Sequence, residues 1–259
     1  MKSIILCEGK TDLILYSYYL NKLCGWQFID INRAYKSKSK DRLLKMTINN
    51  RDTQEYNWYY RENDILCIYA VGSKYNFINA LEEIVLLNLA ASNDNFDKVV
   101  IISDRDDSNS EVEIIKNIWT YFSKSSIKFK HIFHNKWNVS DDYDDSGNIF
   151  RLALLPLIIP FNESGTIEIF MLNCRKEISD GENTLIEDIY RFIDELAENN
   201  YVKSNYLQER GLIPKSKLST YFSIVSPNRT FDVGNKILES IPWERYTEFH
   251  KTLHLLSEI

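Results

Sequence analysis

The sequence predicts an α/β fold, a mostly parallel sheet flanked by helices with a helical C-terminal extension. Three observations predict it. Short apolar runs at residues 3–7, 64–71 and 98–102 have the length and composition of buried strands. Each run is followed by a turn and then by a helical pattern, and this alternation favours a parallel, doubly wound sheet. The last quarter of the chain shows helical periodicity alone.

The first part of the chain begins with the strand at 3–7 and the turn Glu8-Gly9. Apolar residues at helical spacing then predict a helix over 11–23, which Cys24-Gly25 closes. Alternation over 26–31 predicts a strand. The polar stretch at about 36–62, rich in lysine and then in aromatic residues, is interpreted as an insertion whose last part, from 49, forms a hairpin.

The middle of the chain continues the alternation of strands and helices. After the strand at 64–71, apolar spacing predicts a helix from Phe77 to Leu89. A helix from about Ser110 to Phe122 follows the strand at 98–102. Further strands are expected at 127–133 and 149–159, separated by an acidic loop at 138–148.

The tail carries four helical patterns, at 166–172, 186–196, 214–225 and 243–256. We therefore expect an α/β domain over residues 1–175 and a helical extension over 176–259 that packs on it.

Composition narrows the class of protein. The 259 residues are 44% hydrophobic, enough for a sizeable core, and the formal charge of −6 argues against a protein that coats nucleic acid through bulk positive charge. None of the four cysteines forms a Cys-x-x-Cys pair, so a zinc site is not expected, and unpaired cysteines fit a reducing cytosol. The start of the chain does not have the form of a signal peptide, and no apolar run is long enough to span a membrane. We expect a cytoplasmic protein.

Acidic residues follow two of the predicted strands. Glu8 comes directly after the first strand, and Asp104 and Asp106 follow the strand at 98–102. In open α/β sheets, ligands bind outside the carboxyl ends of the strands. If the two strands are neighbours in one parallel sheet, these carboxylates lie close together and repel one another. A bound divalent cation usually offsets such repulsion.

These residues carry a resemblance to a known family. Glu8-Gly9-x-x-Asp12 after a first strand, with Asp104-x-Asp106 after a later one, is similar to the topoisomerase–primase (Toprim) domain. The form of the first motif most resembles the Toprim of the overcoming-lysogenization-defect nucleases and small stand-alone Toprim-like proteins of unknown function. The resemblance extends to about residue 225 and includes the glycine after a middle strand, Gly72 here.

The resemblance implies a Toprim-like (Rossmann-like) fold and a hydrolase that uses Mg²⁺, or Mn²⁺, to cleave phosphodiester bonds of DNA or RNA. It implies metal ligands at Glu8, Asp12, Asp104, Asp106 and Glu168. Catalytic roles fall on Glu8, Asp104 and Asp106, and on a lysine that opens a late helix, matched by Lys215 or Lys217.

The same resemblance bears on partners. Relatives are often fused to, or encoded beside, an ABC-type ATPase, and this sequence contains no Gly-x-x-x-x-Gly-Lys-Ser/Thr motif. Such an ATPase would be a separate chain, and the protein would then be the effector of a phage-defence pair. The alternative is a catalytically inactive Toprim module that binds nucleic acid or a partner protein. Another phosphoryl-transfer enzyme, such as a nucleotidyltransferase, is a third option.

Each candidate residue also has a plainer interpretation. Asp12 lies where a first-turn acid is favoured by the helix dipole alone. Asp104 and Asp106 are typical of a strand-end turn. Glu168, Lys215 and Lys217 are equally compatible with solvated positions on helices.

Overall fold

The computed structural model describes residues 1–29, 55–90, 95–106, 109–145, 148–161, 164–209, 211–227 and 241–259. The chain divides into two compact units. The first comprises Met1–Ser103, Asn109–Ile158 and Leu255–Ile259, and the second comprises Asp104–Ser108 and Ile159–His254.

The first unit is built on a seven-stranded sheet of mostly parallel strands. Its order is β2 (Gln27–Phe28), β3 (Glu55–Arg61), β4 (Asp64–Ala70), β1 (Lys2–Cys7), β5 (Lys98–Asp104), β9 (Ala153–Ile159) and β6 (Asn138–Val139). β1 pairs in parallel with both β4 and β5, and the edge strands β3 and β6 pair antiparallel with β4 and β9. The Ala153 amide donates to the Asp97 carbonyl at 2.9 Å and the Arg105 amide to the Ile159 carbonyl at 2.6 Å, so β5 and β9 are also parallel.

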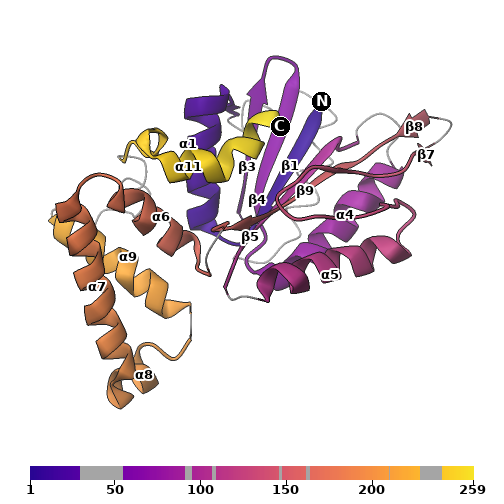
Figure 1. The fold of residues 1–259 in the computed structure, drawn as a ribbon. Helices are drawn as coiled ribbons and strands as arrows, with labels where there is room; N and C mark the ends of the chain where they lie inside the picture. The colour runs from indigo at the N-terminus through magenta and orange to yellow at the C-terminus, as the bar shows by residue number, and fades with distance from the viewer. Residues whose placement is uncertain are drawn as a thin grey trace. The chain divides into compact units, whose positions relative to one another are not determined.

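Helices cover both faces of this sheet (Figure 1). α1 (Lys10–Cys24) lies on one face, and α4 (Phe77–Ala90) and α5 (Ser110–Lys124) lie on the other. Alternate strand residues explain the division, because side chains along a strand point to opposite faces. Leu6 and Ile101 belong to the core cluster that contains the apolar residues of α4 and α5.

Smaller elements complete the first unit. They are the 3-10 helices η1 (Lys74–Asn76) and η4 (His254–Glu258) and the two-stranded sheet of β7 (Tyr143–Asp145) and β8 (Asn148–Phe150). The last residues of the chain pack in this unit: Leu256 and Ile259 are fully buried, and the Lys98 Nζ donates to the Glu258 carbonyl.

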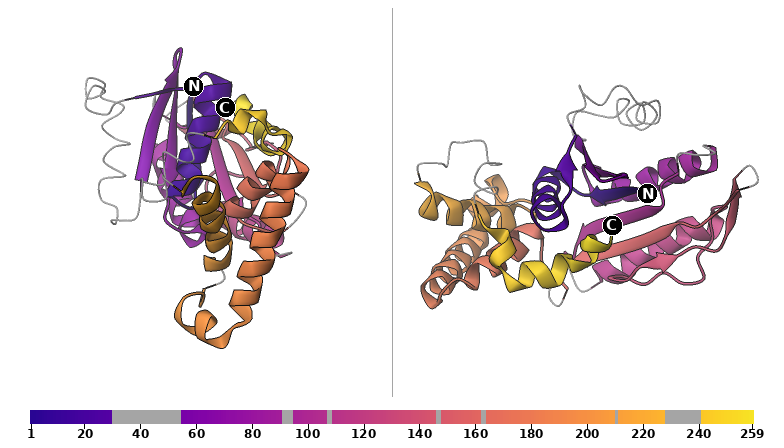
Figure 2. Two further views of the ribbon diagram at one scale, coloured as in Figure 1. Left: turned by 90° about the vertical axis from the view of Figure 1, so that its left-hand side faces the viewer. Right: turned by 90° about the horizontal axis from the view of Figure 1, so that it is seen from above.

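The second unit is helical. It contains α6 (Ile167–Lys176), α7 (Asp180–Glu198), α8 (Asn200–Asn205), α9 (Leu212–Val225), η3 (Trp243–Arg245) and α11 (Thr247–Leu253). Figure 2 shows α7 and α9 side by side. Buried aromatic residues from three of these elements, Phe170, Trp243 and Phe249, stack within this unit.

The predicted α/β class, with mostly parallel strands, flanking helices and a helical C-terminal region, is confirmed. The expected strand over 127–133 is wrong. Ile127 and Phe129 are buried, as alternation predicts, but the alternation then fails, because Ile132 is buried and Phe133 is 57% exposed. The backbone of Phe133, however, hydrogen-bonds the side chain of Asn138 instead of a neighbouring strand.

Two further expectations need correction. The acidic stretch at 138–148, expected as a loop, contains β6 and the first strand of the β7–β8 hairpin. The helix expected over 243–256 is divided into η3, α11 and η4. Within the predicted insertion at 36–62, residues 36–54 lie outside the described residues, and Glu55–Arg61 forms sheet strand β3.

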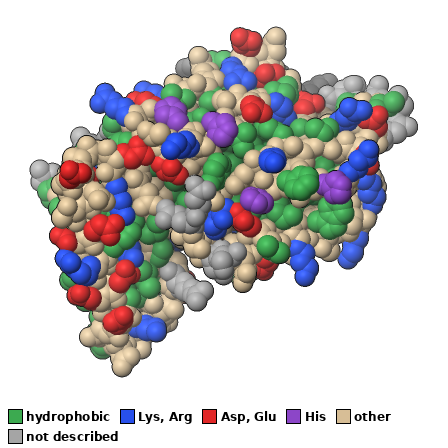
Figure 3. All heavy atoms as spheres, viewed as in Figure 1, with side chains coloured by type: hydrophobic (Ala, Val, Ile, Leu, Met, Phe, Trp, Pro, Cys, Tyr) green, Lys and Arg blue, Asp and Glu red, His purple; other side chains and the backbone are tan. Residues whose placement is uncertain are grey.

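In the described part of the chain, no helix combines the length and apolar character that crossing a membrane would require. On the face drawn in Figure 3, Lys and Arg side chains are interspersed with Asp and Glu.

Candidate functional site

Glu8 lies where β1 ends, in the turn that leads to α1. Its Oε1 accepts a hydrogen bond from the Ser103 hydroxyl at 2.8 Å, and its backbone carbonyl accepts one from the Gly72 amide at 2.9 Å. Ser103 is near the end of β5, and Gly72 follows β4. The residue after β1 is therefore hydrogen-bonded to the carboxyl ends of both parallel neighbours of that strand.

Asp12 occupies the first turn of α1 and is 7% exposed. Its Oδ2 accepts from the Gly9 amide at 3.0 Å, and its Oδ1 accepts from the Tyr16 hydroxyl at 3.3 Å. The bond to Gly9 completes a capping arrangement at the start of the helix. Asp12 therefore has a structural role of its own, and its role as a metal ligand stays a prediction.

Asp104 and Asp106 belong to the second unit. The Asp104 Oδ1 accepts from the Ile167 amide, the first residue of α6, at 2.9 Å. A carboxylate at this position satisfies one of the unpaired amides at a helix start and complements the helix dipole. Asp106 is exposed. Asp104 follows Ser103 directly in the chain.

Arg105, between the two aspartates, holds this short segment in the second unit. Its backbone carbonyl accepts from the Gly165 amide at 2.6 Å, and its Nε donates to the Pro160 carbonyl at 2.8 Å. These bonds connect the segment to the residues that lead into α6. The residue that follows Asp104 is thus held by hydrogen bonds within the second unit.

The remaining predicted residues are on the helices of the second unit. Glu168, in the first turn of α6, is 7% exposed, and Lys215 is exposed on α9. Lys217, 9% exposed, is engaged: its Nζ lies 2.8 Å from the Asp194 Oδ1 and 4.5 Å from the ring centre of Tyr190. Of the two lysines, Lys215 is therefore the one that faces solvent.

Among the residues that the structure describes, no three His, Cys, Asp or Glu side chains form a group that could hold a metal ion. Neutral groups donate hydrogen bonds to three of these acids: a hydroxyl to Glu8, a backbone amide to Asp104, and one donor of each kind to Asp12.

Sequence reasoning missed two features. Ser103 was not recognised as a partner of Glu8; the available signal was a hydroxyl directly before an acidic strand end. The second is a cluster around Arg175, whose Nε lies 2.5 Å from the Tyr221 hydroxyl and whose Nη2 lies 3.1 Å from the Glu182 Oε1. Tyr246 also accepts from this guanidinium. The only signal was an arginine in the last turn of a helix.

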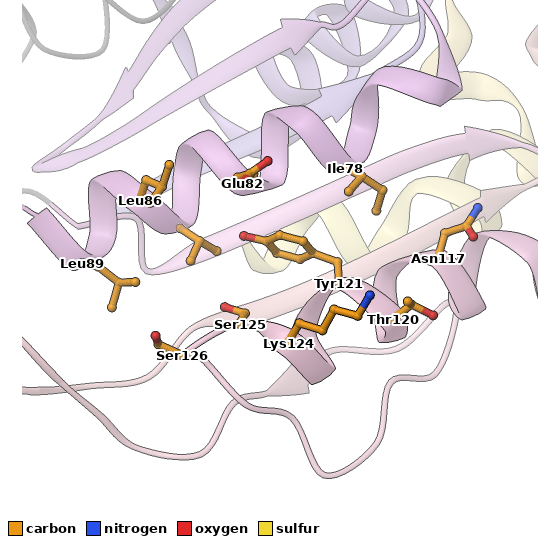
Figure 4. Close-up of a pocket in the computed structure, with 11 residues that line it drawn as sticks. Ile78, Glu82, Leu86, Leu89, Asn117, Thr120, Tyr121, Lys124, Ser125 and Ser126 are labelled. Atoms are coloured by element: carbon orange, nitrogen blue, oxygen red, sulfur yellow. The ribbon is translucent and has the colours of Figure 1, made fainter.

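A groove of about 600 Å³ runs between α4 and α5 in the first unit (Figure 4). Apolar side chains of α4, including Ile78 and Leu89, line it together with Tyr121 of α5. Burial raises the pKa of Tyr121 to about 12, with the charge of Glu82 adding to the effect. A smaller cavity of about 110 Å³ shares Ile78 and Asn117 with the groove.

Comparisons with known proteins give one family and one solved structure. The family described as "Protein of unknown function (DUF3226)" matches residues 2–251. The crystal structure of a hypothetical protein from Pyrococcus horikoshii OT3 is similar, with a TM-score of 0.59 and 17% sequence identity; 99% of this chain and 98% of that chain are covered. At this identity the likeness concerns the fold alone. The search of curated proteins gave no match.

Proposed function

The chain belongs to the DUF3226 family, and we propose that it is a divalent-metal-dependent nuclease that cleaves phosphodiester bonds of DNA or RNA. The observation that carries the proposal is the hydrogen bond between Glu8 and Ser103. It joins the carboxyl ends of two adjacent parallel strands, and Asp104 is the next residue after Ser103. The resemblance of these motifs to the Toprim domain gives the acids their expected chemistry.

The residues proposed to hold Mg²⁺, or Mn²⁺, are Glu8, Asp104 and Asp106, with Asp12 and Glu168 completing the set. All five are carboxylates, the hard oxygen donors that Mg²⁺ prefers. A carboxylate has two oxygens and about four acceptor positions, so the hydrogen bonds to Ser103 and Ile167 are compatible with a further ligand. When bound, such an ion stabilises negative charge on a phosphoryl oxygen and its attacking or leaving groups.

The chain's own residues would orient the acids. The Ser103 hydroxyl fixes one oxygen of Glu8, which leaves fewer orientations for the carboxylate to lose on binding an ion. An exposed lysine, Lys215, would supply positive charge toward a phosphate. Lys217 would require separation from Asp194 to do the same.

A second function is favoured by the helix caps. Asp12 and Asp104 both bind backbone amides at the starts of helices, at 3.0 Å and 2.9 Å. Acids that serve as caps are retained for stability without any metal. These bonds support the alternative of a catalytically inactive Toprim module that binds nucleic acid or a partner protein.

The two functions are separated by metal binding and cleavage measured together. We expect Mg²⁺ or Mn²⁺ to raise the melting temperature of the wild-type protein. At an ion concentration 100 times Kd, binding should add about 2.7 kcal/mol to the free energy of unfolding. We also expect cleavage of plasmid DNA or total RNA with the same ions. Glu8→Gln should abolish both effects, and Glu187→Gln, on the exposed face of α7, should abolish neither.

Full metal-dependent cleavage by Glu8→Gln would contradict the nuclease assignment. Nucleic-acid binding without a metal response or cleavage would favour the inactive module. The separate ABC-type ATPase remains part of the proposal and is tested by adding candidate ATPases encoded near the gene. We place the protein in the cytoplasm because its four cysteines are unpaired, as expected in a reducing compartment.

A further inference from the structure

The cavity of about 110 Å³ lies in the first unit, between the start of α4 and the first turns of α5. Lys74 and Tyr75, which follow β4, and Ser110, which follows β5, line it, so the cavity lies toward the carboxyl ends of these strands; Ile101, from the middle of β5, also contributes. This is the edge of an α/β sheet at which ligands bind. The groove of Figure 4 continues from it through Ile78 and Asn117.

The size of the cavity selects its ligand. An engineered protein cavity of roughly 150 Å³ holds one benzene molecule. A space of about 110 Å³ is smaller, so it can take at most a single ring, and the two fused rings of a purine would not fit.

The lining has the two kinds of group that recognise such a ring. Its walls are apolar, from Phe77, Ile114 and Ile118 among others, and can pack against the faces of an aromatic ring. Three polar side chains of α5, Ser110, Glu113 and Asn117, also line it. A carboxylate accepts from the exocyclic amino group of cytosine, and a carboxamide can donate to the ring nitrogen or carbonyl.

The mouth of the cavity has features that suit the rest of a nucleotide. Lys74 and Tyr75 line it, and Tyr75 is 79% exposed. The Lys74 Nζ is a donor for phosphate, and the Tyr75 ring offers a surface for stacking. Both follow Gly72, whose amide donates to the Glu8 carbonyl at 2.9 Å, so the loop that borders the cavity also contacts the residue after β1.

We propose that this cavity binds the base of a pyrimidine nucleotide, with cytosine preferred, and that Lys74 holds its phosphate. The proposal deepens the proposed function, on which it rests for the claim that the nucleotide belongs to a strand that is cleaved. The substrate feature that it adds is an unpaired pyrimidine bound in the first unit, the unit that contains Glu8. Base binding itself needs no metal.

The test is titration calorimetry of the full chain in EDTA with CMP, UMP, AMP and ribose 5-phosphate. We expect CMP to bind at least tenfold more tightly than ribose 5-phosphate, at least fivefold more tightly than AMP, and more tightly than UMP. Equal affinity for CMP and ribose 5-phosphate would show a phosphate site without a base pocket and would overturn the proposal. Absence of CMP binding would overturn it as well.

Two matched pairs of variants locate the site. Ile114→Trp fills the cavity and should weaken CMP binding at least tenfold, whereas Ile115→Trp, the next half-buried residue of α5 and outside the lining, should change it less than twofold. Should Ile114→Trp fail to fold, Asn117→Ala against Lys116→Ala tests the same point at exposed positions. We expect at least a threefold loss for Asn117→Ala alone; no difference within the pair would overturn the proposal.

The outcomes also separate this inference from the nuclease proposal. CMP binding in EDTA without any metal-dependent cleavage would support the pocket and remove the nuclease. Cleavage that depends on Glu8, with no CMP binding and no preference for pyrimidines at the cut site, would support the nuclease and remove the pocket.

Discussion

Two groups of polar side chains, one in each unit, hold their carboxylates by different means. Glu8 in the first unit accepts a hydrogen bond from the uncharged hydroxyl of Ser103. Glu182 in the second unit accepts from the guanidinium of Arg175 and from Tyr221. A bond from an uncharged hydroxyl orients a carboxylate and leaves its charge in place, whereas a guanidinium neutralises it. The second group is therefore suited to joining helices, and the bond to Glu8 is compatible with the cation that we propose there.

The largest expected effect tests the structural side of this comparison. Arg175→Met removes the donor shared by α7, α9 and the residue before α11, and leaves the partly buried Glu182 without its cation. We expect a loss of about 2–3 kcal/mol in the free energy of unfolding. Urea denaturation measures it.

Arg191→Met is the matched control. Arg191 pairs with Asp188 on α7 at 2.6 Å, but both side chains are more than half exposed. Such a surface pair contributes about 0.5 kcal/mol or less. Equal losses for the two variants would mean that the Arg175 cluster is not a structural centre of the second unit.

The next effect tests the cation side. Ser103→Ala removes the hydroxyl that orients Glu8. Loss of an outer partner of a metal ligand typically weakens metal affinity about tenfold or more. The measurement is the Mg²⁺ or Mn²⁺ concentration that gives half of the thermal shift. An unchanged midpoint would show that this hydrogen bond serves the fold alone.

Asp12 distinguishes a helix cap from a metal ligand. Asp12→Ala loses the bond from the Gly9 amide and should cost about 1 kcal/mol in unfolding free energy. Asp12→Asn keeps an oxygen that can accept this bond and should cost less than about half as much. If Asp12 is also a metal ligand, the asparagine variant will retain stability and lose metal-dependent cleavage. If the variant retains both stability and cleavage, Asp12 acts only as a helix cap.

Lys217 is expected to matter less for stability than Arg175. Its partner Asp194 is 57% exposed, so the ion pair is partly open to solvent. Lys217→Met should lower the free energy of unfolding by about 0.5–1 kcal/mol, mainly through that pair and the contact with Tyr190. Lys215→Met, at an exposed position, should leave the free energy of unfolding unchanged. A larger loss of stability there than at Lys217 would show that Lys215, and not Lys217, is the lysine that stabilises the fold.

The smallest effect is a pH dependence in the Arg175 cluster. Burial raises the pKa of Tyr221, and the hydrogen bond to Glu182 raises it further. Because the folded pKa lies above the unfolded value of about 10, this tyrosine's contribution is fully present below pH 10 and is lost as the pH rises beyond it. Between pH 9 and pH 11, the free energy of unfolding of the wild type should fall more steeply with pH than that of Tyr221→Phe. The difference between the two slopes should correspond to at most about one bound proton. Parallel slopes would contradict this origin.

The sequence predicted the sheet because β1, β4 and β5 are continuous apolar runs, a pattern typical of strands buried on both faces. It could not predict that Ser103 meets Glu8, because that contact depends on which strands are neighbours and on their register. Alternation at 127–133 indicated the burial of Ile127 and Phe129 correctly, but Phe133 is exposed, and the Asn138 side chain, not a strand, hydrogen-bonds its backbone. The Arg175 cluster joins residues up to 71 positions apart, which local patterns do not reveal.

The first unit consists of three separate stretches, and the larger part of the second unit, Ile159–His254, is inserted before the last of them. A ribosome delivers residues in order, so all seven sheet strands emerge before any helix of the second unit. Lys98 nevertheless acquires its partner at Glu258, and the buried Leu256 and Ile259 reach their places, only after the inserted unit has been synthesised. The nascent sheet must therefore wait, partly uncovered, for its final segment, which makes this interval the one in which a chaperone would matter most.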